Sequence, residues 1–481
     1  MTNSLTQLSN NKMKRALSLD ALRGFAILMM VLSGAIPFGV LPAWMYHAQT
    51  PPPSHQFNPN LPGITWVDLV FPFFLFALGT AIPLALGRRI AKGDSSKNII
   101  WHVIERTLLL GFFAIFLRHV RPYIINPDIW TNPRISNQFL GLLGFILMFA
   151  IFIRSPKHWS KQLSLGIKIG GWVGAVLMLI FLRYPDGNGF SLYRNNIILV
   201  VLTNAFFFGS IIWLATRKNI LLRLAILGIY LGLRLSHDSG GWIGWIWTWS
   251  PFPWIYRLDY LKYLFIVIPG TIIGDLFIDW KRRLSDTTKF AWSSKRLFWI
   301  IIVMLSIILI ELVGLQARWL WQTTLLSFLL LIAGGWLAQK PGNELEKLIK
   351  TFFAWGAIWL ILGLVFEPFE GGIKKDHSTI SYYFLTSGLS IFLLIAFMII
   401  IDIFKKQKLL QLLIDNGQNP MIAYVGLGNF IRPVFGLLMI DRLINVITPT
   451  PWLGFLRGVF YTLFLAFIVR LLTRSKLFWR T

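Results

Sequence analysis

The chain has 481 residues, of which 56% are hydrophobic and 14% charged, and its mean hydropathy is +0.64. Soluble domains carry about 25% charged residues, so this composition excludes an ordinary soluble protein and indicates a polytopic membrane protein. The formal net charge of +26 does not indicate nucleic-acid binding, because Lys and Arg lie in short clusters between apolar segments. Since there is no cysteine, disulfides, thiolate catalysis and Cys-type zinc sites are excluded.

Apolar segments of spanning length recur along the whole chain. A spanning helix needs about 20 apolar residues, and roughly fourteen segments qualify, some of them short or interrupted. Their centres lie near residues 28, 75, 108, 146, 174, 205, 228, 267, 306, 330, 357, 391, 429 and 462. The sequence therefore predicts an all-α transmembrane helix bundle of roughly 12–14 spans. We expect one transmembrane domain over residues 1–481, with a short polar N-terminus at residues 1–15 and no cleavable signal peptide there.

Basic loops alternate with loops of little positive charge. The loop at residues 41–62 has no Lys or Arg, whereas the next turn and every second loop after it are basic. These clusters include Arg88, Arg89, Lys92 and Lys97; Arg217 and Lys218; Lys281, Arg282 and Arg283; Lys405, Lys406 and Lys408; and Arg474, Lys476 and Arg480. Because basic loops face the cytoplasm, both termini are predicted to be cytoplasmic and residues 41–62 to face outward.

Three of the predicted outer loops nevertheless carry cations. They contain Arg118, Arg121 and Arg134; Arg183 and Arg194; and Lys374 and Lys375. Lys and Arg on the outer side run against the tendency of basic loops to face the cytoplasm. We therefore expect them to bind an anionic ligand or to pair with buried carboxylates.

His47 and Asp68 are the main catalytic candidates. His47 follows the first predicted span in AWMYHAQ, and Asp68 begins the second in GITWVDLVFPFF. Adjacent antiparallel helices bring the end of one beside the start of the next, so the two side chains are predicted to meet. A carboxylate orients an imidazole that acts as a general base near neutral pH. An equally weighted interpretation makes Asp68 a helix cap and His47 an interfacial polar residue. His55, in the Pro-rich PPPSHQFNPN, is the competing base.

Other charged positions have two interpretations each. Asp20 and Arg23 stand three apart on one helical face, as an interfacial ion pair or as a cytoplasmic site for a phosphate-bearing ligand. Glu105 and Arg106, inside the third span, are predicted to form a buried structural pair. The outer loop at residues 237–257 holds five Trp, which favours an interfacial aromatic belt over a platform for stacking on a sugar.

Two late segments add polar candidates. The sequence GIKKDHSTISYY places Lys374, Lys375, Asp376 and His377 on the outer side. In NGQNPMIAYV, Asn419 is predicted to be the N-cap of a helix that begins with Pro420. The sequence contains no P-loop, dinucleotide fingerprint, HExxH or G-x-S-x-G.

Four stretches resemble the heparan-α-glucosaminide N-acetyltransferase family and its bacterial relatives. They are SLDALRGFAILMMV; HA followed by GITWVDLVFPFFLFALG; NPRISNQFLGLLGF; and KKDHSTISYYFLTSG followed by NGQNPMIAYV. The resemblance implies transfer of an acetyl group from cytoplasmic acetyl-CoA, the acyl donor, to the amine of an amino sugar or glycan on the far side, without a metal. It places the family's essential His, as base or transient acetyl carrier, at His47 and the Asp of its DLVFP block at Asp68.

On this resemblance, Asp20, Arg23, Lys375 and Asn419 are candidates for binding acetyl-CoA or the acceptor. The implied location is the bacterial cytoplasmic (inner) membrane. The implied partners are membrane lipids, acetyl-CoA and the glycan acceptor; no nucleic acid is expected, and a homodimer stays open. The chain departs from the family in the inserted PPPSHQFNPNLP and at Ser378, where the family has Trp. The alternative is a transporter or flippase for an anionic glycan or lipid-linked sugar.

Overall fold

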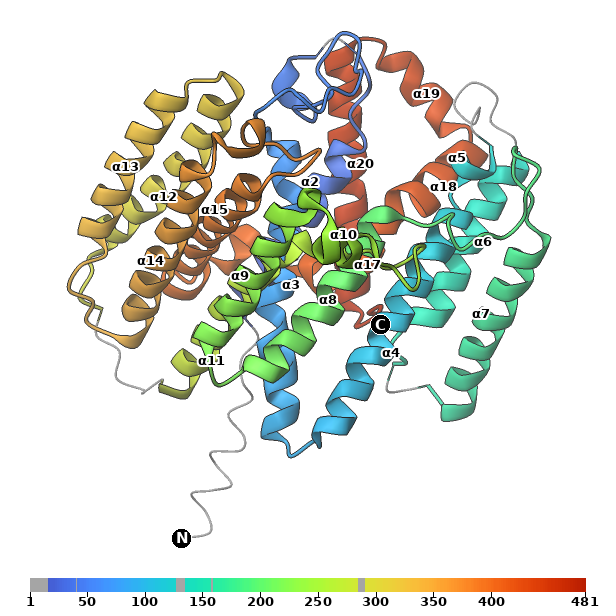
Figure 1. Ribbon diagram of the computed structural model, residues 1–481. Coiled ribbons are helices and arrows are strands. Elements are labelled where there is room, and N and C mark those ends of the chain that lie inside the picture. Colours follow the sequence, from blue (N-terminus) through green and yellow to red (C-terminus); the bar gives the residue numbers. More distant parts are fainter. Residues whose placement is uncertain (1–15, 40, 127–134, 157–158, 284–289) are drawn as a thin grey trace.

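A computed structural model describes residues 16–39, 41–126, 135–156, 159–283 and 290–481. These residues form a bundle of long helices whose axes run broadly in one direction (Figure 1). Among them the only β-type pairing is an isolated bridge between Ile153 and Trp479. The predicted all-α transmembrane fold is therefore confirmed. The predicted polar N-terminus and Arg134 lie outside the described residues.

The first half of the described chain contains α2 (Leu17–Ser33), α3 (Trp66–Ala91), α4 (Ser96–His119), α5 (Pro122–Ile125), α6 (Ile135–Phe152), α7 (Lys161–Phe181), α8 (Ile197–Thr216), α9 (Ile220–Ser236), α10 (Gly241–Thr248) and α11 (Leu264–Arg283). The second half contains α12 (Ser294–Gln316), α13 (Leu320–Leu337), α14 (Glu344–Val365), α15 (Ile380–Met398), α16 (Gln411–Gln418), α17 (Pro420–Gly426), α18 (Arg432–Leu437), α19 (Ile440–Ile447) and α20 (Pro451–Arg474). Short 3-10 or π segments include η1 (Ala43–Met45), η4 (Leu258–Tyr263), η6 (Ile399–Ile403) and η8 (Leu427–Ile431).

Every predicted span centre falls within a helix. In the described part of the chain, twelve helices are long and apolar enough to span a membrane. The two other centres, near residues 28 and 429, fall in α2, which has 17 residues, and in the broken segment α16–α17–η8–α18. The twelve helices make the protein an integral membrane protein, and their number lies at the lower end of the predicted 12–14 spans.

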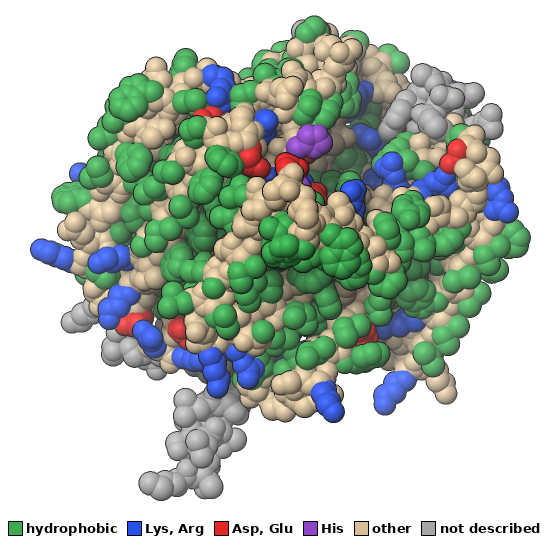
Figure 2. All heavy atoms as spheres, viewed as in Figure 1, with side chains coloured by type: hydrophobic (Ala, Val, Ile, Leu, Met, Phe, Trp, Pro, Cys, Tyr) green, Lys and Arg blue, Asp and Glu red, His purple; other side chains and the backbone are tan. Residues whose placement is uncertain are grey.

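The two ends of the bundle differ in charge. The α2–α3 loop lies at the top of Figure 1 and the α3–α4 turn at the bottom. We call the first end the loop face, defined by residues 34–65 and 366–379, which meet where Gly63 N–H donates to the Ile373 carbonyl. The other end, the basic face, carries the turns at residues 88–97 and 217–218. Figure 2 shows Lys and Arg gathered along this lower rim.

Helix α15 is the centre of the fold. Every residue from Ile380 to Met398 is buried, and α15 packs against α14, α12, α11, α3 and α2. Its polar side chains satisfy backbone carbonyls that prolines leave free in its neighbours. Pro269 removes the N–H that would bond to the Phe265 carbonyl, and the Ser387 hydroxyl donates to that carbonyl over 3.2 Å. This exchange matters in a membrane, where no water satisfies a free carbonyl.

Candidate active site

Asp68 holds the site together from the first turn of α3. Its side chain is fully buried. One carboxylate oxygen, Oδ2, accepts from the backbone N–H of Thr65 (2.9 Å) and of Ala48 (3.2 Å), while Oδ1 lies 2.6 Å from His47 Nδ1. The bond from Thr65 is half of a capping box that begins α3. The two interpretations of Asp68, as a helix cap and as a partner of His47, therefore both hold, one for each oxygen.

His47 is held with one ring nitrogen toward the protein and the other free. An ionised carboxylate only accepts hydrogen bonds, so the bond to Asp68 places the imidazole proton on Nδ1. Nε2 then carries the lone pair, and it has no partner among the described residues. The side chain is 40% exposed. An oriented imidazole with an accessible Nε2 is the arrangement that a general base or a nucleophile requires.

Lys375 comes from the segment before α15 and lies against the same imidazole. Its Nζ is 3.3 Å from His47 Nδ1 and 3.1 Å from Asp376 Oδ2. Because Nδ1 already donates to Asp68, the contact with Lys375 is electrostatic. Lys375, which was predicted as a binding residue, thus contacts the predicted base, although 328 positions separate the two residues in the sequence.

The backbone of Asp68 is anchored by a residue that the sequence reasoning missed. Pro72 lies inside α3, four residues after Asp68, and has no N–H to donate to the Asp68 carbonyl. The hydroxyl of Tyr382, on α15, donates to this carbonyl over 2.6 Å. The signal in the sequence was the D-x-x-x-P spacing, which leaves one carbonyl inside an apolar helix without its usual partner. What the spacing does not show is which side chain supplies the donor.

A cavity of about 530 Å³ opens beside His47 on the loop face. Its walls come from α2, α3, the start of α8 and the broken segment α17–η8–α18. The polar and charged residues of its lining are Ser33, His47, Arg121, Tyr263, Lys375, Asp376, Tyr424 and Arg432. Figure 2 shows a hollow in this region with cationic side chains at its rim. The cavity therefore combines one imidazole with an excess of positive charge.

A smaller, apolar cavity continues below it toward the basic face. It has a volume of about 40 Å³ and shares Met30, Phe71, Ile198 and Tyr424 with the lining of the first. Its other walls, such as Phe74 on α3, are apolar throughout. The two cavities share part of their walls, and their linings are polar at the loop face and apolar in the interior.

His55, the competing base, lies outside this cavity lining. Its Nε2 is 3.2 Å from the Gly39 carbonyl, and its ring packs edge-on against Tyr46 and Phe38 with centroid distances of 4.5 and 5.1 Å. The Pro-rich loop thus uses His55 for its own packing. The geometry favours His47 over His55 as the base.

Asp20 and Arg23 pair over 3.5 Å near the basic-face end of α2. Arg23 also donates to the Gly417 carbonyl of α16 over 3.3 Å. The helices approach this closely because Gly24 and Gly417 face each other's helix, where a Cβ on either would overlap backbone atoms of the other helix.

The predicted Glu105–Arg106 pair is wrong. Glu105 is exposed and approaches His102 over 3.8 Å. Arg106 instead lies over the Phe206 ring at 5.0 Å and is close enough to Arg23 to repel it electrostatically. Two neighbours in the chain point to different sides of a helix because successive residues are about 100° apart. The Nε of Arg106 is buried without a partner.

Asn419 occupies the N-cap position of α17, as predicted, but its side chain makes no capping bond. The amide Nδ2 donates to the Leu477 carbonyl (2.8 Å), and Oδ1 accepts from the Trp479 N–H (3.1 Å). Asn419 therefore fastens the C-terminal tail, and it is not part of the lining beside His47. Its predicted binding role has no support from this geometry.

Three of the described outer-loop cations, Arg118, Arg183 and Arg194, have partners within the protein. Arg194 pairs with Asp186 over 2.5 Å; the N–H of Asn188, and to a lesser extent Arg194, hold the pKa of Asp186 below its usual value. Arg183 donates to two backbone carbonyls, and Arg118 to the Tyr123 hydroxyl. Of the described outer-loop cations, Arg121 and Lys375 reach the His47 cavity.

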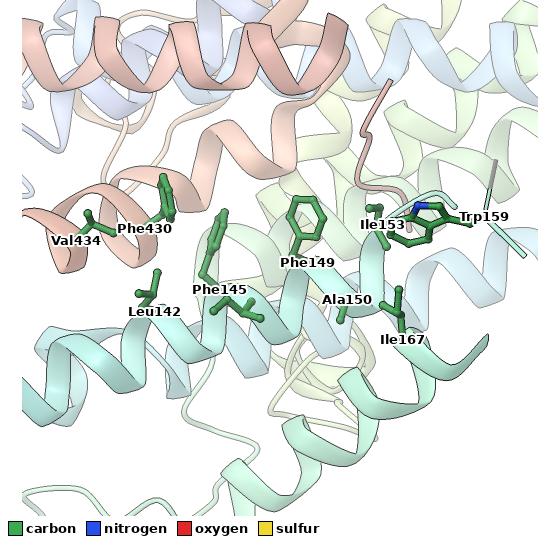
Figure 3. Close-up of a pocket in the computed structure, with 10 residues that line it drawn as sticks. Leu142, Phe145, Phe149, Ala150, Ile153, Trp159, Ile167, Phe430 and Val434 are labelled. Atoms are coloured by element: carbon green, nitrogen blue, oxygen red, sulfur yellow. The ribbon is translucent and has the colours of Figure 1, made fainter. Parts of the chain in front are cut away.

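Two further surfaces offer no reactive groups. A groove of about 510 Å³ between α6, α7 and the broken segment has an apolar lining that includes Phe145, Phe149, Phe430 and Val434 (Figure 3). On α10 and just after it, Trp242, Trp245 and Trp249 are exposed, as expected of an interfacial belt. No cluster of three or more metal-ligating side chains occurs in the described ranges.

Comparisons with known proteins give one matching family and two relatives. A family described as "Domain of unknown function (DUF5009)" matches residues 15–277, which include His47 and Asp68. Human heparan-alpha-glucosaminide N-acetyltransferase is 29% identical over 198 residues, 36% of this chain and 27% of the human protein. The mouse protein of the same name is 29% identical over 131 residues, 27% of this chain and 18% of the mouse protein. The matches thus span about a quarter or less of these relatives.

Proposed function

We propose that this chain, which belongs to the DUF5009 family, is a membrane-embedded acyltransferase. It moves an acetyl group from acetyl-CoA to the amine of an amino sugar or glycan; the support is that the human and mouse relatives are named heparan-alpha-glucosaminide N-acetyltransferase. The proposal places the acceptor at the loop face, outside a bacterial cytoplasmic membrane, and the donor at the basic, cytoplasmic face.

One observation carries this proposal. His47 is oriented by a fully buried Asp68 over 2.6 Å and presents a free Nε2 on a cavity of about 530 Å³. Buried ionisable groups at membrane depth are costly and are kept for function. A transporter needs charged groups along its path, but it does not need an imidazole held in one tautomer by a carboxylate.

The proposed reaction uses His47 as the base. The acceptor amine attacks the thioester carbonyl, the new N–C bond forms, and the C–S bond breaks to release CoA as a thiolate. His47 Nε2 takes the proton that the amine nitrogen loses, and Asp68 stabilises the imidazolium. Lys375 Nζ, held by Asp376, faces the oxyanion that forms transiently on the carbonyl. In a variant of this scheme, Nε2 itself attacks the thioester and carries the acetyl group to the amine.

The donor would enter from the basic face. Arg23, Arg89 and Arg106 interact there electrostatically, and no described carboxylate pairs with Arg106. Arginine matches phosphate geometry, so this cluster suits the phosphates of CoA. Eleven residues of α2 separate Arg23 from Gly34, a helix rise of about 16 Å.

The test is turnover of radiolabelled acetyl-CoA by the purified protein with a panel of amino sugars and cell-envelope glycans. We expect label transfer to fall by about 10²-fold or more in His47→Ala, because a general base contributes about 10²–10⁴-fold. His55→Ala is the matched control and should keep most of the activity. Label that stays on the protein after an acid quench, and that requires His47, would indicate the acetyl-histidine variant.

Normal transfer by His47→Ala would overturn the assignment. So would a loss confined to His55→Ala, which would move the base to the Pro-rich loop. If the parent protein neither binds acetyl-CoA nor transfers label, a transporter or flippase for an anionic glycan or lipid-linked sugar becomes the better assignment.

A further inference from the structure

We propose that the His47 cavity contains an anion subsite, centred on Arg121, that binds a carboxylate, sulfate or phosphate group of the acceptor. The inference deepens the proposed function and rests on it, because it assigns the acceptor to the anionic amino sugars. It starts from the charges that line the cavity.

Two of the three cations in the lining have a carboxylate nearby. Lys375 Nζ lies 3.1 Å from Asp376 Oδ2. Arg432 interacts favourably with Asp441 at the start of α19. Arg121 has no carboxylate partner among the described residues; its guanidinium lies over the Tyr424 ring at 6.0 Å. Arg121 and Arg432 are also close enough to repel each other.

Arg121 also has an unused donor. Its Nε is buried and makes no hydrogen bond to any residue that the structure describes. Buried polar groups in folded proteins almost always have a partner, so an orphaned donor on a cavity wall points to an acceptor that is supplied from outside the chain. A planar guanidinium offers its donors as a fork that matches the oxygens of a carboxylate or phosphate.

The fold makes room for this guanidinium. Arg121 is the N-cap of the short helix α5, directly after α4. Directly against the guanidinium, the π segment η8 presents Gly428, where a Cβ would overlap Nη1 of Arg121. A side chain at position 428 would push the guanidinium away from its place. Two segments that are about 300 residues apart in the sequence thus combine to hold one arginine on the cavity wall.

The position of Arg121 assigns the anion to the acceptor. Arg121 lines the loop-face cavity together with His47, where the acceptor amine has to approach Nε2. The donor phosphates have their own cations, Arg23 and Arg106, at the opposite end of α2. An acceptor with its amine at His47 and an anionic group at Arg121 would be oriented at two points.

The test compares a neutral and an anionic acceptor that share the same amine. With purified protein and acetyl-CoA, kcat/KM is measured for glucosamine and for glucosamine 6-phosphate in the parent, Arg121→Gln, Gly428→Ala and Arg118→Gln. We expect Arg121→Gln to lower kcat/KM for the phosphorylated sugar by about 10-fold or more relative to glucosamine, because it removes a charged hydrogen-bonding partner. Gly428→Ala should give a smaller shift in the same direction. Arg118→Gln, which lies outside the lining, should give none.

Two results would overturn the subsite. One is an equal loss for both sugars in Arg121→Gln, which would mean a structural role. The other is a loss seen with acetyl-CoA but not with acetyl-pantetheine, which has no phosphate; the subsite would then belong to the donor.

A binding measurement separates this inference from the transferase assignment. Thermophoretic titration with glucosamine 6-phosphate, without acetyl-CoA, should show weaker binding to Arg121→Gln than to the parent. If the parent shows no turnover but this binding depends on Arg121, the subsite stands and the transferase assignment fails. If turnover is normal and binding ignores Arg121, the subsite alone fails.

Discussion

At the scale of single residues, the site depends on how Asp68 divides its two oxygens. One caps α3 through the Thr65 N–H and the other holds His47. The cap places the carboxylate at the first turn of a spanning helix. The loop before this helix brings His47, which is 21 residues earlier in the sequence, into contact with the carboxylate. A carboxylate buried this completely is costly unless every oxygen is bonded. Here the helix-capping bond and the bond to His47 together satisfy this carboxylate.

The first prediction concerns Asp68→Asn. The amide oxygen of Asn can still accept from the Thr65 N–H, so α3 should keep its cap. The amide NH₂ would then face His47 Nδ1 and donate to it, which moves the imidazole proton to Nε2 and removes the base. We expect kcat to fall by about 10²–10⁴-fold, with little change in the thermal unfolding midpoint.

Turnover of labelled acetyl-CoA and thermal unfolding in detergent check this prediction. Asp279→Asn, an exposed carboxylate paired with Arg282, is the control and should leave both values unchanged. A parental kcat in Asp68→Asn would show that the tautomer of His47 is irrelevant to the reaction.

At the scale of elements, α3 and α15 are joined through a proline. Pro72 has no N–H to donate to the Asp68 carbonyl, and the Tyr382 hydroxyl of α15 donates to it instead over 2.6 Å. The short DLVFP block and the SYY segment more than 300 residues later are therefore two halves of one contact. Without the tyrosine, the backbone carbonyl of Asp68 would have no hydrogen-bond donor.

A double-mutant cycle tests this contact. Tyr382→Phe should lower the free energy of unfolding by about 1–3 kcal/mol, the cost of an unsatisfied buried polar group. Pro72→Ala restores an N–H at the position where the helix can bond to the Asp68 carbonyl. In Tyr382→Phe/Pro72→Ala the loss should therefore be smaller than the sum of the single changes, by about 1 kcal/mol.

Denaturation midpoints of the four proteins, measured in one detergent, provide the comparison. Tyr383→Phe is a control of equal chemistry, since its hydroxyl donates to Ser378 Oγ over 2.6 Å, and Pro72→Ala should not compensate for it. Strict additivity of Tyr382→Phe and Pro72→Ala would contradict the proposed exchange of donors.

The broken segment α16–α17–η8–α18 is the second element that shapes the site. Asn419 and Pro420 interrupt the helix, and the π segment η8 turns the chain again before Pro433. Membrane proteins tolerate non-α-helical backbone where it lines a cavity. Here the breaks present Tyr424, Gly428 and Arg432 to the His47 cavity.

At the scale of the whole molecule, both described ends of the chain lie away from the His47 loop (Figure 1). The C-terminal tail closes the structure on that side. Trp479 is buried against Phe145, Phe149 and Phe152, and Asn419 holds the backbone around it. The tail therefore locks the broken segment to α6.

Sidedness is directly testable because the chain has no cysteine. We expect a single cysteine at Ser54, in the loop of His47, to react with a membrane-impermeant maleimide in intact cells. A cysteine at Ser475, after α20, should react only once the membrane is permeabilised. Both positions are exposed in the structure.

The unmodified chain gives the background for this labelling experiment. Labelling of Ser475→Cys but not Ser54→Cys in intact cells would invert the orientation and place the proposed acceptor in the cytoplasm.

Features that depend on neighbouring residues followed from the sequence alone. Spanning helices were located by their apolar length, and the meeting of His47 and Asp68 followed from one loop between consecutive helices. The signals were local in both cases. The roles assigned to these two residues stay predictions until the variants are measured.

Contacts between distant segments were decided by the tertiary structure. Nothing in the sequence paired Tyr382 with Asp68, separated Glu105 from Arg106, or turned Asn419 toward the tail. In a soluble helix an apolar stripe marks the buried face, but α3 and α15 are apolar on all sides. Lipid and the protein interior are equally apolar, so the sequence does not show which side of a helix faces the protein. The packing of the helices determined the direction in which each polar side chain points.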